Sequence, residues 1–220
     1  MRILAIETAT EACSAAVLDG SQCYQRFEVR PRAHLRLLLP MVTSVLEEAG
    51  LELEDLDAIA FGCGPGGFTG LRIAAGVAQG LALGADLPVV PVSNLAVLAA
   101  AAFAETPAEI VVVCQDARMD EVYWATFRRG ADGLPSSLTP ERLALPAAVE
   151  APVSGWRGVG SGWQMYPELR ARFAGVAEIE AVARLPRAAQ VALLATRIVR
   201  EGGAVPAEQA APVYLRDGVT

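Results

Sequence analysis

The stretch from Ala58 to Gly84 constrains the fold more than any other part of the sequence. It opens with a short apolar run, residues 58–61, which predicts a buried strand. A turn around Pro65 follows, with glycines at positions 62, 64, 66 and 67. Because glycine tolerates positive φ and lets two backbones approach closely, we expect this turn to be tight or to touch another segment. Thr69 then stands where a helix N-cap belongs, and the predicted helix runs to about Gly84.

This helix carries a stripe of glycines. Gly76, Gly80 and Gly84 recur every four residues and therefore share one helix face. Each interior glycine costs roughly 0.5–1 kcal/mol relative to alanine, so the stripe indicates a surface that another helix approaches closely. That neighbour is either a partner protein or another element of the same domain, and the stripe alone leaves both open.

The same glycine-rich turn resembles a phosphate cradle, since free N–H groups at a helix N-terminus bind anions. A P-loop also needs a lysine followed by serine or threonine at the helix start. Those places hold Phe68 and Thr69, and the sequence contains no lysine. The pattern excludes a P-loop.

Composition sets the class of protein. The 220 residues are 53% hydrophobic, enough for one large domain or two lobes with their own cores. No run of eighteen apolar residues is free of charges and helix breakers, and the N-terminus does not resemble a signal peptide, so we expect a cytoplasmic protein without a membrane span. The net charge of −7 disfavours stand-alone binding of nucleic acid.

The cysteines and the histidine suggest no metal site. The four cysteines are scattered without a CxxC pair, and all lie in or beside apolar strands, which predicts buried free thiols. His34 is the only histidine and stands at the start of a predicted helix, 33–49. It is interpreted as a capping or surface residue.

The chain repeats one plan about 110 residues apart: an apolar strand, a polar turn with one acid, a second strand and a second turn. We therefore predict two duplicated lobes, residues 1–105 and 106–220, with the tail 204–220 packing back on the first. The expected strands are 2–7, 14–18, 22–29, 58–61, 88–92, 110–114, 121–127 and 176–181. The expected helices are 33–49, 69–84, 93–103, 163–173 and 186–201, and residues 134–157 are expected to be irregular.

Five segments resemble the TsaB (YeaZ) family and span the whole chain. The most specific is Gly-Pro-Gly-Gly-Phe-Thr-Gly-Leu-Arg-Ile at 64–73, and the others are residues 6–10, 92–95, 116–123 and 212–216. The resemblance implies an α/β fold of the actin-like (ASKHA) type, in which two duplicated lobes hold mixed sheets flanked by helices. This agrees with the duplicated plan.

The resemblance also implies a function. A protein of this family is a non-catalytic scaffold subunit of the complex that transfers a threonylcarbamoyl group to the adenosine next to the tRNA anticodon. It pairs with and activates its paralogue TsaD. An ATPase partner, TsaE, joins the two proteins. Contact of this subunit with tRNA is indirect. TsaD-like proteins carry two metal-binding histidines four residues apart, and the matching positions here are Asn94 and Leu98. No metal and no catalytic residue is therefore expected.

The nucleotide-binding loops of an actin-like protein have counterparts here. Thr8 and Thr10 lie in the first phosphate loop, Asp116 in the second, and Gly160 and Gly162 in the adenosine loop. We interpret these loops as vestigial, with ATP or ADP expected only within the complex.

An alternative is an actin-like ATPase or kinase that uses Glu7 or Asp116 to organise a metal. A peptidase is the weakest alternative, because neither a metal motif nor a triad can be built around His34.

For the partner surface, the resemblance points to the two helices predicted at 33–49 and 69–84, which would dock on the same helices of TsaD. A homodimer through this surface is also expected. The predicted contact residues are Leu35, Leu39, Leu71, Arg72, Ala75, Gly76, Gln79, Gly80 and Leu83.

Overall fold

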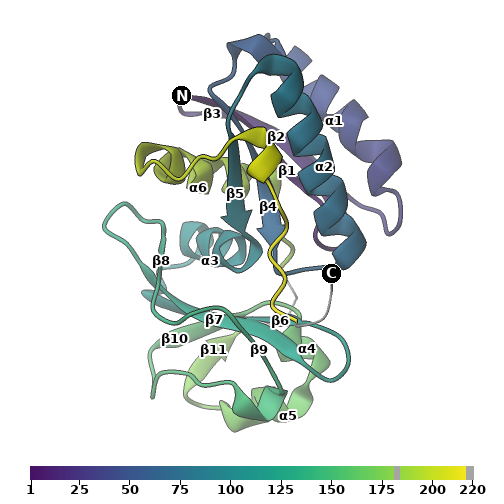
Figure 1. Cartoon of the computed structure of the whole chain (residues 1–220). Coiled ribbons are helices and arrows are strands. Elements are labelled where there is room, and N and C mark those ends of the chain that lie inside the picture. The colour runs from purple at the N-terminus through teal and green to yellow at the C-terminus, as the bar shows by residue number, and fades with distance from the viewer. Residues whose placement is uncertain (181–183, 217–220) are drawn as a thin grey trace. The chain divides into compact units, whose positions relative to one another are not determined.

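In a computed structural model, residues 1–180 and 184–216 are described, and they form two compact units (Figure 1). Unit 1 comprises residues 1–97 and 186–213, and unit 2 comprises residues 98–185 and the chain from 214 onward. This division differs from the predicted boundary after residue 105, since the segment 186–213 returns to unit 1.

Unit 1 is built on a five-stranded mixed sheet with the order β3-β2-β1-β4-β5. Its strands are β1 (Arg2–Glu7), β2 (Ala12–Asp19), β3 (Gln22–Val29), β4 (Ala58–Gly64) and β5 (Val89–Ser93). The first three form an antiparallel meander, whereas β4 pairs parallel with both β1 and β5. The prediction of strands at these places is confirmed.

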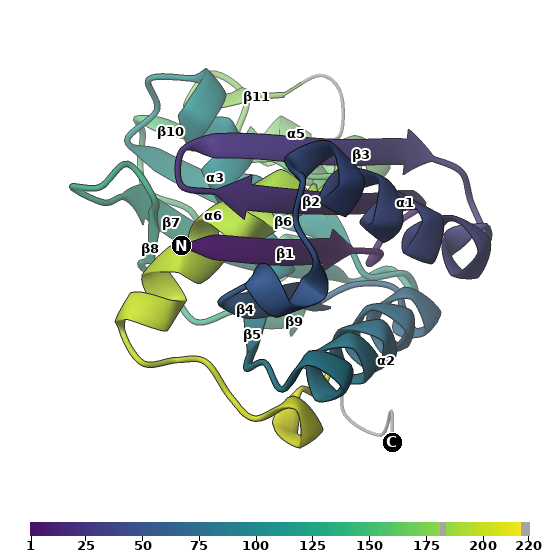
Figure 2. The ribbon, with the colours of Figure 1, turned by 90° about the horizontal axis from the view of Figure 1, so that it is seen from above.

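Helices cover both faces of this sheet, as Figure 2 shows. Helices α1 (His34–Ala49) and α2 (Phe68–Ala85) lie on one face, and α6 (Ala188–Arg200) packs on the other against β1 and β2. Helix α3 (Asn94–Glu105) follows β5 and runs across the boundary between the units. The hydroxyl of Ser93 accepts a hydrogen bond from Ala96 N at 3.1 Å and so caps this helix.

Helix α2 begins differently from the prediction. Gly67, not Thr69, is the N-cap residue, and no side chain caps the helix. The carbonyl of Gly67 already accepts the amide of Leu71 at 3.0 Å, so the first turn starts before Thr69. The predicted cap at Thr69 is therefore wrong.

The segment after α6 is tied to unit 1. Val205 bridges to Val89, Ala207 and Ala210 join the core beneath α2, and Val213 N donates to the carbonyl of Cys63 at 2.7 Å. A 3₁₀ turn, Ala207–Gln209, lies within this segment. The last part of the predicted tail, 217–220, lies outside the described residues.

Unit 2 repeats the strand plan of unit 1. Strand β6 (Ile110–Asp116) pairs antiparallel with β7 (Val122–Arg129) and parallel with β10 (Trp156–Val159). The outer strands are β8 (Pro135–Ser137) beside β7 and β11 (Ala177–Ile179) beside β10, while β9 (Arg142–Ala144) also pairs with β7. In the sheet order β11-β10-β6-β7-β8, the central strand β6 thus has one antiparallel and one parallel neighbour, as β1 has in unit 1.

Three predictions for unit 2 differ from the structure. The predicted helix 163–173 is two pieces, α4 (Gly162–Met165) and α5 (Pro167–Arg172), because the residue before a proline is forced out of the helical region; Tyr166 has φ −119° and ψ 87°. The segment 134–157, expected to be irregular, contains β8, β9 and the 3₁₀ turn Pro146–Ala148. The predicted strand 176–181 is shorter, and residue 181 lies outside the described residues.

Candidate functional site

The outer face of α1 and α2 is apolar and exposed. Leu35 and Leu39 on α1 are 77% and 51% exposed, and Leu83 on α2 is 65% exposed. The glycine stripe belongs to this face, since a Cβ added at Gly76 or Gly80 would meet no atom within 4 Å. Packing inside unit 1 therefore does not explain these glycines.

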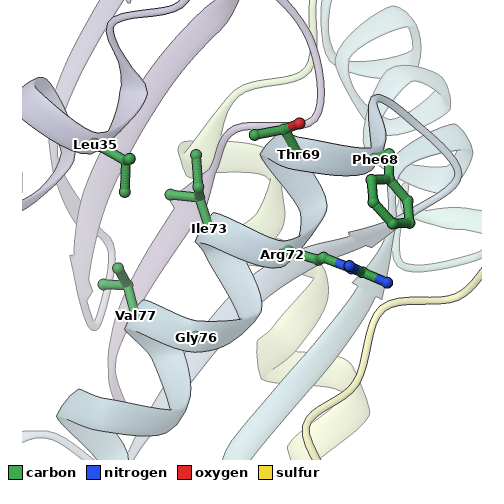
Figure 3. A pocket seen from close by; sticks show the side chains of 7 residues that line it. All are labelled: Leu35, Phe68, Thr69, Arg72, Ile73, Gly76 and Val77. Atoms are coloured by element: carbon green, nitrogen blue, oxygen red, sulfur yellow. The ribbon is translucent and has the colours of Figure 1, made fainter. Parts of the chain in front are cut away.

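A groove of about 480 Å³ separates the two helices (Figure 3). Leu35 of α1 lies opposite Ile73 and Val77 of α2, while Phe68 and Arg72 line one end. The Arg72 guanidinium lies over the Phe68 ring, 3.7 Å from its centroid. The groove thus combines an apolar wall with one cation stacked on an aromatic ring.

By length and composition alone, helix α2 is long and apolar enough to cross a membrane, although no membrane span was expected. Among the described residues it is the one helix of sufficient length and hydropathy, and 28% of it is buried. Its inner side packs on the sheet through Leu71, Ala74 and Ala78. The apolar outer side is the surface that a partner could cover.

Three of the predicted contact residues do not lie on this outer face. Leu71 and Ala75 are buried in the core of unit 1. The Gln79 side chain is partly buried and donates to the carbonyl of Ala210 at 2.7 Å. These positions lie on the sides of α2 that face the sheet and the C-terminal segment, so they support the helix rather than present a contact.

The glycine-rich turn before α2 packs against the turn between β1 and β2. Gly67 N donates to the carbonyl of Ala9 at 2.7 Å. A Cβ at Gly70 would overlap the carbonyl oxygen of Thr8, whose hydroxyl donates to the carbonyl of Gly70 at 2.7 Å. These glycines are required because two backbones meet here.

Thr10 and His34 hold the same β1–β2 turn from another side. The hydroxyl of Thr10 accepts from Ala12 N at 3.3 Å. His34 Nε2 lies 2.8 Å from the carbonyl of Thr10 and 3.2 Å from that of Ala12, so this nitrogen carries the donated proton. His34 therefore ties α1 to the turn, and the prediction that it caps the helix is wrong.

Glu7 is a buried carboxylate at the end of β1. Its Oε1 accepts from Ala9 N and its Oε2 from Asn94 Nδ2, both at 2.6 Å. Asn94 Oδ1 in turn accepts from Gly64 N at 2.7 Å. Burial raises the pKa of Glu7 to about 7, while the hydrogen bonds from Ala9 and Asn94 oppose this rise.

Sequence reasoning did not find this network. Asn94 was considered only as the place where a TsaD-like protein has a histidine. In the structure a Cβ at Gly62 would overlap the Glu7 carboxylate, so only glycine fits beside the acid, but the sequence does not show which residue this glycine faces.

The candidate residues of unit 2 come together at the end of β6. The amide of Asp116 donates to the Ser161 hydroxyl at 3.0 Å, which brings it beside the loop of Gly160 and Gly162. The carboxylate of Asp116 accepts from Arg118 N at 3.0 Å and from the Tyr166 hydroxyl at 3.1 Å. Asp116 is thus a turn residue whose carboxylate is hydrogen-bonded within its own unit.

Gly160 and Gly162 are required for packing in this loop. Gly160 has φ +106°, and a Cβ there would overlap the carbonyl of Cys114. A Cβ at Gly162 would lie 2.6 Å from the Cys114 sulfur. Close approach to β6 is sufficient to explain both glycines.

The side chains that could ligate a metal ion do not gather at one place in the part of the chain that the structure describes. Within residues 1–180 and 184–216, no group of three histidine, cysteine or acidic side chains could hold a metal ion. Asn94 and Leu98 are both buried, and leucine offers no ligand atom. The four cysteines are free thiols as expected, although Cys23 is exposed, which corrects the prediction that all are buried.

Comparison with known proteins gives one consistent result. A family model described as "TsaD: tRNA N6-adenosine threonylcarbamoyltransferase" matches residues 28–220. The chain is 43% identical over 223 residues to the "tRNA threonylcarbamoyladenosine biosynthesis protein TsaB" of Escherichia coli (strain K12), covering 100% of this chain and 96% of that protein. The Haemophilus influenzae protein of the same name is 38% identical, with coverages of 100% and 95%. The solved structure "YeaZ from Pseudomonas aeruginosa" matches with a TM-score of 0.89 and 44% identity, over 97% of this chain and 99% of that one.

Proposed function

The chain belongs to the TsaB (YeaZ) family, and on that premise we propose that it acts in threonylcarbamoyladenosine biosynthesis as a non-catalytic subunit that pairs with TsaD and activates it. The observation that carries this proposal is the exposed apolar face of α1 and α2 with its open glycine stripe. Large exposed apolar patches on folded proteins mark interaction sites.

TsaD fits this face because it is related to this chain. The TsaD family model matches residues 28–220, a range that includes both α1 and α2. TsaD is therefore expected to have equivalent helices, and two similar faces can pair about an approximate two-fold axis. The glycines at 76 and 80 permit close approach of the helices, and a standard interface of roughly 1,200–2,000 Å² is the expected size. Without TsaD, the same face is expected to form a homodimer.

The non-catalytic role is supported by how the candidate residues are used. The hydroxyl of Thr8, the carboxylate of Glu7 and the carboxylate of Asp116 are all hydrogen-bonded within their own units. A phosphate in the first loop would also have to lie near the buried Glu7. We accordingly place nucleotide binding at the assembled complex with TsaE, and tRNA contact largely with the partners, because this chain has a net charge of −7.

The test is a substitution on the stripe. Gly80→Arg adds a long charged side chain to the outer face, where an added Cβ meets nothing in unit 1. Because arginine has a higher helix propensity than glycine, we expect the variant to fold with a thermal stability no lower than that of the wild type. It should bind TsaD from the same organism at least about 100-fold more weakly, which corresponds to a loss of about 3 kcal/mol of binding free energy. Gly80→Ala is the control for the added Cβ, and Ala171→Arg, at an exposed position of α5, is the matched control for one added charge.

Binding is measured by titration calorimetry and light scattering, and tRNA modification is assayed with and without this chain. Undiminished pairing of the arginine variant would remove the α1–α2 face from the proposal. Steady ATP turnover by the isolated chain, abolished in Asp116→Ala, would favour the alternative of an actin-like ATPase.

A further inference from the structure

Among the described residues, Glu7 is the one acidic side chain that is buried. The proposed pairing function does not use Glu7 as a contact, because its side chain is buried and bonded to Ala9 and Asn94 instead of lying on the exposed α1–α2 face. Burying a carboxylate costs folding free energy unless hydrogen bonds replace those lost to water, so the burial of Glu7 needs an explanation.

The donors around Glu7 are matched to the ionised carboxylate only. One oxygen accepts from the amide of Ala9 and the other from the side-chain NH₂ of Asn94. A protonated carboxyl carries its O–H on one of these two oxygens, and a neutral hydroxyl oxygen is a weaker acceptor than a carboxylate oxygen. Asn94 cannot rotate its oxygen toward Glu7, because that oxygen already accepts from Gly64 N and rotation would oppose two donors. Protonation therefore weakens at least one hydrogen bond in the network.

Both arms of the network lead to the first turn of α2. On one side, Ala9 accepts from Gly67 N, the N-cap residue of α2. On the other side, Asn94 holds Gly64, from which the glycine-rich turn begins. The helix turn fixed in this way carries Phe68 and Arg72, which line one end of the groove in Figure 3.

Among the described residues, no cation contributes to the pKa of Glu7. The charged or titratable groups on β2, β4, α3, α6 and the β1–β2 turn are Cys13, Asp19, Cys63, Glu105, Arg197, Arg200 and Glu11. None of them is a cause of its raised pKa, which comes from burial and is opposed by Ala9 and Asn94. The Cys13 thiol does sense the acid: burial and then the charge of Glu7 raise its pKa to about 11. From α1, His34 donates to the same turn.

We propose that Glu7 is a proton-sensitive positioning residue, which in its ionised form holds the first turn of α2 in the geometry that receives the partner. Protonation releases the turn and weakens pairing. This inference rests on the proposed function for its consequence, but the release itself is a property of the isolated chain.

The expected size follows from titration around pH 7. Glu7 is ionised in about nine-tenths of molecules at pH 8 and in about one-tenth at pH 6, given its pKa of about 7. If only the ionised form receives the partner, the apparent Kd rises with the inverse of that fraction, by about 10-fold from pH 8 to pH 6.

The first experiment uses the chain alone. Hydrogen exchange of the Ala9, Gly64 and Gly67 amides is measured from pH 8 to pH 6 and corrected for the intrinsic pH dependence. We expect protection to fall about 10-fold in the wild type and in Glu11→Gln, an exposed acid of the same turn. In Glu7→Gln, whose amide cannot accept from both donors, protection is expected to be low and independent of pH. Wild-type protection that does not change over this range overturns the proposal.

The second experiment measures TsaD affinity over the same pH range. The pH dependence of the wild type is compared with that of Glu7→Gln, so that groups titrating on TsaD cancel. A ratio of the Glu7→Gln Kd to the wild-type Kd that is about 10-fold larger at pH 8 than at pH 6 supports the inference, and parallel curves overturn it. If the wild type does not bind TsaD at any pH, the proposed function fails, whereas the exchange experiment still decides whether Glu7 holds the turn. That experiment needs only the wild type if Glu7→Gln does not fold.

Discussion

Replacing Glu7 by glutamine is expected to change how the stability of the protein depends on pH. Burial raises the pKa of Glu7 from its ordinary value of 4.5 to about 7, and each pKa unit is worth about 1.4 kcal/mol. Between these values the folded protein binds more protons than the unfolded chain, so the free energy of unfolding falls as pH rises. From pH 4.5 to pH 7 the free energy of unfolding of the wild type should fall by about 3 kcal/mol more than that of Glu7→Gln. Above pH 7 the difference between the two proteins should be constant.

The assay is urea unfolding followed by far-ultraviolet circular dichroism, at closely spaced pH values from 4.5 to 8. Glu11→Gln, which removes an exposed acid from the same turn, should run parallel to the wild type. Parallel curves for the wild type and Glu7→Gln would refute the reasoning, because they would mean that burial of this carboxylate has no net cost. The local release of the α2 turn does not conflict with greater stability at low pH, since one lost hydrogen bond costs only about 1 kcal/mol.

Three further predictions concern the glycines, the partner face and unit 2. Gly70→Ala should lower the free energy of unfolding by about 1–3 kcal/mol, because the added methyl overlaps the β1–β2 turn, whereas Gly76→Ala meets nothing and should raise it by about 0.5–1 kcal/mol; urea unfolding measures both. Leu83→Glu should weaken TsaD binding at least about 10-fold in calorimetry and change the stability of the isolated chain by less than about 0.5 kcal/mol. Asp116→Ala should lower the pKa of Tyr166 from about 12, since burial raises this pKa most and the hydrogen bond and charge of Asp116 raise it further. Phenolate absorbance during a pH titration measures the pKa.

The sequence predicted the fold class well. The actin-like α/β fold with two repeated mixed sheets is confirmed, and so is the family. Strand pairing followed from apolar runs and turn residues that are adjacent along the chain. The assignment of residues 186–203 to unit 1 was not predicted, because it depends on α6 packing against β1 and β2, which are more than 160 residues away. Ala188 N donates to the Ser14 hydroxyl across 174 residues.

The glycines illustrate why the site could be predicted only in part. Gly70 and Gly76 stand in one helix and have the same intrinsic preferences, yet the first touches Thr8 and the second is open. Helical periodicity alone could have separated Leu71 and Ala75 from the outer face, since Leu71, Ala74, Ala75 and Ala78 form one inward stripe. The neighbour of Gly70 could not be inferred, because it lies 62 residues away in the sequence.

The same long-range contacts give the polar loops of unit 1 a structural role. Anion binding at a helix N-terminus requires free N–H groups. Here Ala9 N is bound to Glu7 and Gly67 N to the carbonyl of Ala9, so neither of these two amides is available to an anion. Their partners are a buried carboxylate and a backbone turn, both of which hold the helix in place. These two amides thus position the surface proposed to bind TsaD, and one set of hydrogen bonds links the glycine-rich turn to the pairing function.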